Sequence, residues 1–269
     1  MNPTKLSLRG AGQVAQHHDE VLAALAAIGN PKRGEAIRLD RGSELQYLGI
    51  GFPALRARVK QGFSFSNQPE AEALAIWDAL WRSSPCGDVL FAALETLAPV
   101  VHKRVPSTLW PTVRHWSERV DNWCHSDALS GLYSCVLEAQ FDAVYPQLQA
   151  WNASPSEWLR RISLTSLIHY SGKNAVFLPP EQMLPLVANC VADHRKYVEL
   201  AVGWVLRELG HVHPDAVTAF LERHAARMSA RAYARAVERR APSERAQLLA
   251  IRKAALGSQR CRRYGGPPP

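Results

Sequence analysis

The sequence predicts an all-α protein built from stacked antiparallel helix pairs, and two features of the chain support this. Ala, Leu, Arg and Glu recur at helical spacing, whereas no run of alternating β-branched and polar residues is bounded by Asn-Gly or Asp-Gly turns. Prolines divide the chain into segments of helix length, and the short connections between the segments favour antiparallel neighbours. The breaks are expected near Pro31, Pro53, Pro69, Pro85, Pro99, Pro106, Pro155, Pro179, Pro180 and Pro214.

Two segments begin with residues that cap helices. Ser154 is followed by a proline, which suits the first helical position, and then by Glu157, which can reach back in a capping box. We expect the helix that follows to cover residues 158–170. Ser229 likewise is expected to cap a final helix that runs through Arg240.

Two segments have the same build: WLRRISLTSLI at 158–168 and VELAVGWVLREL at 198–209. Their spacing gives a period of about forty residues, and helix pairs at this period are typical of HEAT-like repeats. Because each repeat packs only on its neighbours, one elongated domain can cover residues 31–256. We expect a polar segment and a helix over residues 1–30. Residues 257–269 are too poor in apolar side chains to pack and are expected to be disordered.

The composition is that of a folded, cytosolic protein. Hydrophobic residues make up 47% of the 269 and charged residues 21%, and the mean hydropathy is -0.19. No apolar run approaches the length of a membrane span, and the N-terminus lacks the apolar core of a secretory signal. The five cysteines form no CxxC pair, so neither disulfides nor zinc are indicated. We expect a cytosolic monomer without a cofactor or metal.

The net charge of +8 is unevenly distributed along the chain. The segment from Arg223 to Arg263 holds twelve Arg and Lys residues against two acidic residues, Glu238 and Glu244. A basic block of this kind indicates a polyanionic partner, of which nucleic acid is the commonest. Basic tails also occur on proteins that never bind DNA, so the block alone leaves the partner open.

The segment 194–210 is the most informative predicted helix. Projected at helical spacing, one arc is apolar and is expected to face the core; it consists of Val198, Val202, Val205, Leu206 and Leu209. The opposite side carries Lys196, Tyr197, Trp204 and Arg207. Aromatic rings among cations need something to cover them. That cover is either a neighbouring repeat or a ligand in a groove, and this helix alone does not decide between the two.

Trp123 and Asp127 lie four positions apart and therefore share one face of a predicted helix. A carboxylate beside an aromatic ring suits a developing cation, because the carboxylate supplies charge and the ring supplies its negative face. The alternative is a helix cap at Asp127 beside a tryptophan of the core.

Two other groups are weaker candidates. His211 and His213 have the spacing of a metal pair, but they follow a glycine in a turn and have no nearby carboxylate or cysteine partner. Cys124 has no base paired with it, so we expect it to be a packing residue rather than a nucleophile.

Five segments, in this order, resemble the DNA alkylation repair family of HEAT-like DNA glycosylases, the AlkD-like proteins. The resemblance covers roughly residues 40–240. Its segments are YLGIGFPALRARVKQ (47–61), LWRSSPCGDVLFAALETL (80–97), NWCHSD (122–127), WLRR (158–161) and AVGWVLREL (201–209). The resemblance implies a right-handed solenoid with a concave basic groove that binds alkylated double-stranded DNA.

The resemblance also implies roles for individual residues. Asp127 matches the catalytic carboxylate of a Trp-x-x-x-Asp motif that begins at Trp123, and Arg161 and Trp204 match further residues of the site. Arg207 matches an arginine that contacts phosphate. Together with the helical projection and the basic block, this gives the expected DNA-binding residues: Arg160, Lys196, Tyr197, Arg207, Arg231 and Arg235.

The implied reaction removes cationic N3- or N7-alkylated purines without flipping the base into a pocket. Two family features are absent: no tyrosine occurs in AIRLDRGSELQ (36–46), and the second residue of a Trp-Trp pair is missing because Asn122 precedes Trp123. Tyr47 is a candidate to replace the missing tyrosine. A relative that binds damaged or branched DNA without cutting it, and a protein-protein scaffold, remain alternatives.

Overall fold

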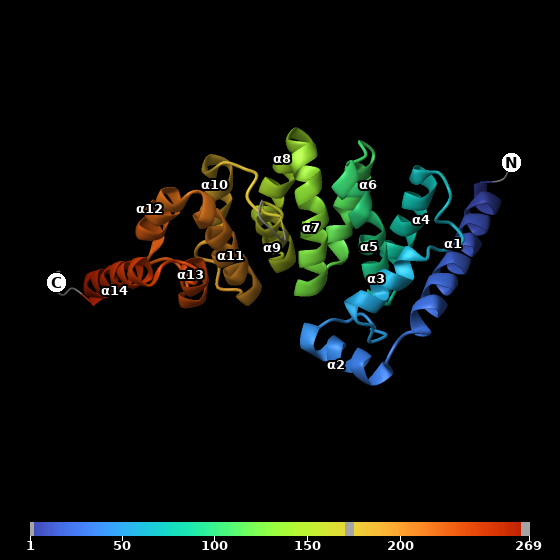
Figure 1. The fold of residues 1–269 in the computed structure, drawn as a ribbon, viewed down its shortest axis with the longest axis horizontal. Helices are drawn as coiled ribbons and strands as arrows, with labels where there is room; N and C mark the ends of the chain where they lie inside the picture. The colour runs from blue at the N-terminus through green and yellow to red at the C-terminus, as the bar shows by residue number, and fades with distance from the viewer. Residues whose placement is uncertain (1–2, 170–174, 265–269) are drawn as a thin grey trace. The chain divides into compact units, whose positions relative to one another are not determined.

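The computed structural model describes residues 3–169 and 175–264 (Figure 1). Helices account for nearly all of the regular structure in these residues. Two isolated β-bridges, Gln46 to Cys86 and Ile168 to Val176, are the β-pairings found there. The predicted all-α repeat fold is confirmed. None of the described helices combines the length and apolar character that crossing a membrane requires.

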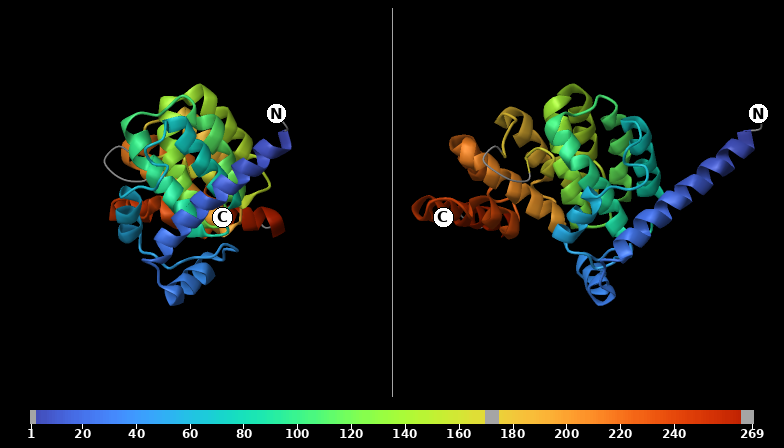
Figure 2. Two further views of the ribbon diagram at one scale, coloured as in Figure 1. Left: turned by 90° about the vertical axis from the view of Figure 1, so that its right-hand side faces the viewer. Right: turned by 45° about the vertical axis from the view of Figure 1, so that its right-hand side comes forward.

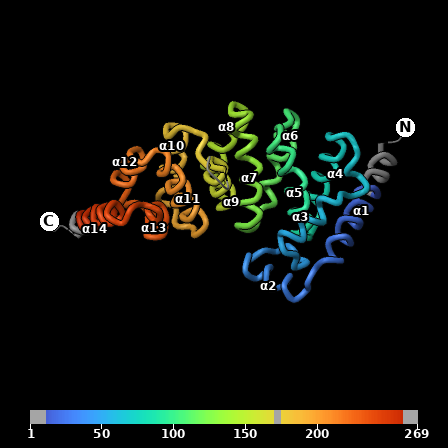
Figure 3. Tube along the Cα trace, in the orientation of Figure 1, coloured from blue at the N-terminus to red at the C-terminus, as the bar shows by residue number. Residues whose placement is uncertain are grey.

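The chain divides into two compact units, Met1–Ala139 (unit 1) and Gln140–Pro269 (unit 2). This boundary falls inside the single domain expected over residues 31–256. Figure 3 traces the chain from α1 to α7 in unit 1 and from α8 to α14 in unit 2.

Unit 1 is organised around α5 (Gly87–Lys103), which contacts α1, α3, α4 and α7. Figure 2 shows α5 and α7 side by side. The other helices of the unit are α1 (Pro3–Ala26), α2 (Pro31–Arg41), α3 (Phe52–Lys60), α4 (Glu70–Ser83), α6 (Leu109–Val113), the 3-10 helix η1 (Arg114–Arg119) and α7 (Trp123–Ala139).

Large aromatic side chains fill the core of unit 1. Trp77, Trp81 and Trp116 are almost completely buried. The rings of Trp81 and Trp116 stack with centroids 4.5 Å apart, and the Trp81 indole N–H donates to the Trp116 carbonyl at 3.0 Å. This pairing connects α4 to η1, which leads directly into α7.

Unit 2 is organised around α11 (Lys196–Val212), which contacts α9, α10, α12 and α13. The apolar arc predicted for this helix is confirmed, because all five of its residues are at most 1% exposed. The remaining helices are α8 (Phe141–Asn152), α9 (Glu157–Thr165), α10 (Pro180–Cys190), α12 (Pro214–His224), α13 (Ala230–Val237) and α14 (Pro242–Tyr264).

The predicted cap at Ser154 is wrong, because Ser156 caps α9 instead. Ser156 has extended backbone geometry, and its hydroxyl accepts from the Leu159 N–H at 3.4 Å. The Ser154 hydroxyl accepts from the Ser156 N–H at 3.1 Å and so stabilises the preceding turn. The helix ends at Thr165 rather than continuing over 158–170, and Tyr170 lies outside the described residues.

Three other boundaries differ from the prediction. Pro99 does not break its segment but lies within α5, where it is exposed while Leu97 and Val101 on either side are buried. Ser229 does cap α13, as predicted, but that helix ends at Val237 and not at Arg240. A further helix, α14, then continues through Tyr264, beyond the point at which disorder is expected to begin.

Candidate functional site

Asn122 caps the N-terminal end of α7, the helix that carries Trp123 and Asp127. Its side-chain oxygen accepts from the backbone N–H groups of Cys124 (3.0 Å) and His125 (3.1 Å), which have no partner within the helix. Because Asn122 fills this position, the alternative of a cap at Asp127 is wrong. Asp127 lies one turn inside the helix.

Trp123 and Asp127 are one turn apart on α7 and differ in burial. Trp123 is half-buried, whereas Asp127 is only 5% exposed. Taking a carboxylate out of water costs several kcal/mol unless other groups stabilise it, so buried carboxylates occur where they serve a structural or functional purpose. The pair therefore offers a desolvated carboxylate beside a partly accessible ring.

A buried hydrogen-bond relay fixes the position of the Asn122 cap. The Asn122 amide donates to the Tyr47 hydroxyl (3.1 Å), which donates to Ser43 Oγ (3.2 Å), and Ser43 donates to Asp121 Oδ2 (2.7 Å). Burial raises the pKa of Asp121, but hydrogen bonds from Ser43, Asn122 and the Glu44 N–H outweigh it, so the pKa lies below its ordinary value. Asp121 is therefore ionised at neutral pH.

His125 completes this network as a neutral side chain. It is fully buried, and burial lowers its pKa to about 4. Its Nδ1 lies 2.8 Å from the Asn122 amide nitrogen and its Nε2 lies 3.0 Å from the Gly87 carbonyl oxygen. This network assigns the proton to Nε2, which then donates to Gly87 on α5.

Arg41, the last residue of α2, lies near the same end of α7, and sequence reasoning did not identify it. Its Cζ atom is 4.7 Å from the ring centroid of Tyr47 and 5.1 Å from that of Phe91. Burial raises the pKa of the Cys124 thiol to about 11, with Arg41 acting to lower the pKa and Asp127 acting to raise it. Cys124 is therefore an unreactive packing residue, as expected, and both charges lie close to it.

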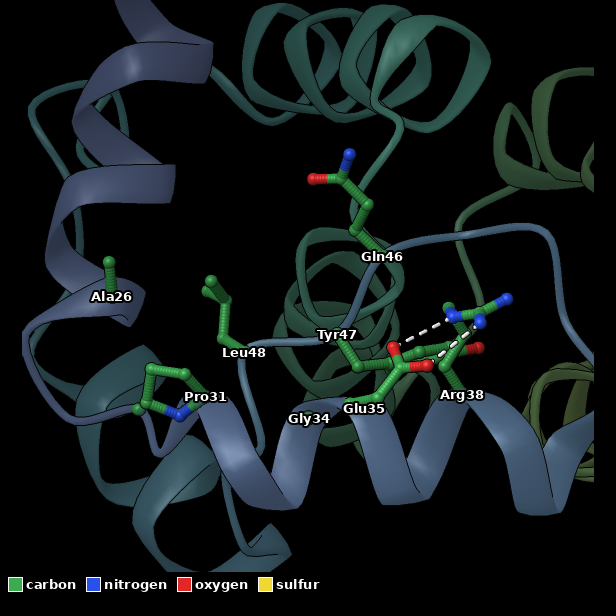
Figure 4. A pocket seen from close by; sticks show the side chains of 9 residues that line it. Ala26, Pro31, Gly34, Glu35, Arg38, Gln46, Tyr47 and Leu48 are labelled. Atoms are coloured by element: carbon green, nitrogen blue, oxygen red, sulfur yellow. Dashed lines mark hydrogen bonds and ion pairs between the residues drawn. The ribbon is translucent and has the colours of Figure 1, made fainter.

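Tyr47 belongs to the interior of unit 1, being 7% exposed. A hollow of about 390 Å³ lies beside it at α2, shown in Figure 4 with the ion pair of Glu35 and Arg38 at its edge. Its lining consists of Ala26, Gly29, Pro31, Gly34, Glu35, Arg38, Gln46, Tyr47 and Leu48. Because Tyr47 is buried and its hydroxyl is engaged in the relay, it does not present an exposed aromatic side chain in place of the missing tyrosine.

In unit 2, residues from α9 and α11 form a cluster of rings and cations. The rings of Trp158 and Tyr197 are 5.0 Å apart, and Lys196 Nζ lies 4.9 Å from the Tyr197 centroid. Arg161 is 5% exposed, and its Nη1 donates to the Tyr197 carbonyl at 2.6 Å. The cluster, with Lys196 exposed at its rim, offers both stacking surface and positive charge. Trp204 is half-buried two turns further along α11.

Arg160 lies on α9 and is partly neutralised within unit 2. Its Nη1 is 3.1 Å from the carboxylate of Asp193, which Arg195 also contacts at 2.5 Å. Its Nε donates to the Ser154 carbonyl at 2.8 Å. These contacts fix the loops before α9 and α11 to each other.

Arg207 is buried and is paired with two carboxylates. It is 7% exposed. Its guanidinium contacts Glu208 at 2.6 Å and also pairs with Glu238, just beyond the end of α13. Burial opposes its charge, but the hydrogen bonds to both carboxylates raise its pKa. Arg207 thus stabilises the packing of α11 on α13, and its predicted contact with DNA stays a prediction.

Two arginines of the basic block form ion pairs on α13, and the pair of Arg231 joins this helix to α11. Arg231 pairs with Glu199 at 2.5 Å, and Arg235 with Glu238 at 3.2 Å. Both arginines keep an exposed fraction near one half, at 51% and 42%. Each can therefore reach an external anion, and Arg231 does so while it holds the two helices together.

The structure thus brings the predicted residues together in two sets. Trp123 and Asp127 share the N-terminal end of α7 in unit 1. Lys196, Tyr197 and Arg161 share the cluster of unit 2. Within the described ranges, no three His, Cys, Asp or Glu side chains are grouped so that they could hold a metal ion.

Comparisons with known proteins agree with this architecture. A family model described as DNA alkylation repair enzyme matches residues 21–239. No curated protein matches the chain. Among solved structures, the chain is similar to a predicted DNA alkylation repair enzyme from Enterococcus faecalis, with 14% identity and a TM-score of 0.67. The similarity covers 80% of this chain and 97% of that one, and at this identity it shows the fold alone.

Proposed function

Because the chain belongs to the DNA alkylation repair enzyme family, we propose that it is a DNA glycosylase for cationic alkylated purines, with Asp127 as its catalytic carboxylate. Its role in DNA repair follows from the family. The reaction that we propose is hydrolysis of the N-glycosidic bond of N3- or N7-alkylated purines in duplex DNA, without flipping of the base. The observation that carries it is the nearly complete burial of Asp127 one turn from the accessible ring of Trp123.

The chemistry of the lesion explains why one carboxylate suffices. Alkylation at N3 or N7 makes the purine cationic, so the C1′–N bond breaks with its electron pair leaving on a base that departs neutral. No general acid is needed. The positive charge that develops on the sugar is stabilised by Asp127, and a water molecule adds its oxygen to C1′ and gives up a proton.

Burial increases the effect that Asp127 can have. A charge acts more strongly in a water-poor site, and the Asn122 cap fixes the helix turn on which the carboxylate lies. Trp123 supplies a ring against which the deoxyribose or the cationic base can pack. In this proposal Trp204 packs on the same substrate, and Arg161 helps to hold it.

The backbone of the DNA is bound by basic residues of unit 2 in this proposal. Lys196 and Tyr197 present a cation and a ring at the rim of their cluster, and Arg231 and Arg235 are half-exposed. Arg160 can contribute from α9. Contacts to phosphates do not depend on the base sequence, so DNA binding should be insensitive to sequence and sensitive to the salt concentration.

The test is release of the base from methylated duplex DNA by the full-length protein, measured by chromatography and mass spectrometry. Wild-type protein should release 3-methyladenine or 7-methylguanine. Asp127→Asn should be slower by about 10²–10³, the usual loss when one electrostatic group of a site is removed. The matched control is Asp19→Asn, which removes a carboxylate that is 82% exposed and should leave the rate unchanged.

The other outcomes are distinct. Tight binding of the duplex with no release would identify a non-catalytic relative that recognises damaged or branched DNA. Negligible binding at physiological salt would favour a protein-protein scaffold. Release that is undiminished in Asp127→Asn would refute the proposed mechanism while keeping the activity.

A further inference from the structure

Arg41 is held in a fixed position at the surface of unit 1 by two aromatic rings. It is half-buried, and its guanidinium lies over Tyr47 and Phe91 at 4.7 and 5.1 Å from their centroids. Gly42 follows it in the left-handed conformation (φ 58°) and ends α2 there, so the arginine is the last residue of its helix. An arginine stacked in this way has already lost most of its conformational freedom and can bind a ligand at little further entropic cost.

No carboxylate lies within ion-pair distance of Arg41 in the part of the chain that the structure describes. The contrast with Arg38, three residues earlier on the same helix, is informative, because Arg38 is paired with Glu35 at 2.8 Å. The charge of Arg41 acts to lower the pKa of Asp88. The Asp88 carboxylate, however, is buried and accepts a hydrogen bond from the Leu48 N–H at 2.6 Å. The positive charge of Arg41 is therefore not neutralised by a close internal partner.

We propose that Arg41 binds a backbone phosphate of the DNA at the end of α7 that carries Asp127. The planar fork of a guanidinium matches the oxygens of a phosphate, and two rings already orient that fork. Arg41 stacks on Tyr47, whose hydroxyl accepts from the Asn122 cap of α7, so a phosphate on Arg41 would lie at the end of that helix that carries Asp127. The inference rests on the proposed function for the identity of the polyanion and for the role of Asp127.

Such a contact would serve the reaction in two ways. It would place one phosphate of the damaged strand at a fixed position, and so set the position of the neighbouring deoxyribose. It would also neutralise Arg41. An uncompensated cation near Asp127 would oppose a cationic lesion, whereas an arginine paired with phosphate would leave the field of the carboxylate in place.

The test compares Arg41→Gln with Arg38→Gln in the full-length protein. Both variants remove one arginine from the last turns of α2, and only the second breaks an existing ion pair. The probe is a fluorescein-labelled, unmodified duplex, and the readout is Kd by anisotropy over a series of salt concentrations. Unmodified DNA offers no lesion to cut, so a failure of the proposed glycosylase activity leaves this measurement unaffected.

Arg41→Gln should weaken binding by about tenfold. It should also make the plot of log binding constant against log salt concentration less steep by about 0.9, which is the contribution of one phosphate. Arg38→Gln should stay within about twofold of wild type with an unchanged slope. An Arg41→Gln protein with wild-type Kd and slope would overturn the proposal, as would equal losses in the two variants.

Thermal melting by circular dichroism accompanies each measurement. If Arg41→Gln does not fold, Arg41→Lys takes its place, with Arg38→Lys as the control. Lysine keeps the charge but not the fork or the stacking, so it should keep the salt slope while weakening binding by a few-fold. A lysine variant that binds as tightly as wild type would show that Arg41 acts only as a general positive charge and would refute the oriented contact.

Discussion

Gly203, on the central helix of unit 2, is predicted to tolerate no larger side chain. A Cβ atom at this position would lie 2.5 Å from Arg235 Cβ and 2.6 Å from the Ala232 carbonyl oxygen, whereas ordinary contact begins at 3.4 Å. Both atoms are fixed to the backbone of α13 and cannot rotate away. α13 would therefore have to move by about 1 Å (3.4 less 2.5) from α11 to restore normal contact.

The size of the effect follows from two opposing contributions. Overpacking of this kind costs roughly 1–3 kcal/mol, and the upper part of that range applies because the obstructing atoms are rigid. Replacing glycine by alanine within a helix favours folding by about 1 kcal/mol. We expect Gly203→Ala to lower the free energy of unfolding by about 2 kcal/mol in total, or the melting temperature by roughly 4–8 °C.

The assay is urea denaturation followed by far-ultraviolet circular dichroism, with Gly257→Ala as the matched control. Gly257 is also helical, in α14, but no heavy atom lies within 4 Å of the place that an added methyl group would take. That variant should gain up to about 1 kcal/mol. A Gly203→Ala protein that is as stable as wild type, while Gly257→Ala is stabilised, would refute the close packing of α11 on α13.

Two further predictions concern charged and titratable groups. Arg207→Gln should lower the free energy of unfolding by about 1–3 kcal/mol, because it leaves Glu208 and Glu238 without their shared partner. It should leave the salt slope of DNA binding unchanged, and a slope reduced by about 0.9 would instead identify Arg207 as a phosphate ligand. His125 has a folded pKa of about 4 against an ordinary value of 6.5, so its neutral form is favoured in the folded state. Its contribution to stability is full above pH 6.5 and is lost as the pH falls toward 4, by about 3 kcal/mol in total. Denaturation at several pH values should show this loss in wild type and not in His125→Gln, and parallel pH profiles for the two proteins would contradict the assignment.

The helical class and much of the helix pattern could be predicted from the amino-acid sequence. The apolar arc of α11, from Val198 to Leu209, could be identified because helical periodicity depends only on residues three and four positions apart. The same locality explains why the Ser229 cap and the shared face of Trp123 and Asp127 were predicted correctly. The predicted cap at Ser154 was wrong, because Ser154 and Ser156 have the same propensity to cap a helix. Only the backbone geometry shows that Ser156 is the cap.

The roles of several polar residues depend on contacts between distant parts of the chain. The family resemblance implied a phosphate contact for Arg207, and the sequence did not show that Glu238, 31 residues further on, pairs with it because α13 packs on α11. Asn122 likewise depends on Tyr47, which is 75 positions away.

Arg41 carried no chemical signal in the sequence, because its importance lies in what surrounds it. Two rings hold it, and no described carboxylate pairs with it. Helix formation is governed by neighbours within about one turn, whereas the partner of a charge is set by which helices pack together. For this reason the sequence could propose Asp127 as a candidate, but only the fold distinguishes the arginines that are paired with carboxylates from Arg41, which has no such partner among the described residues.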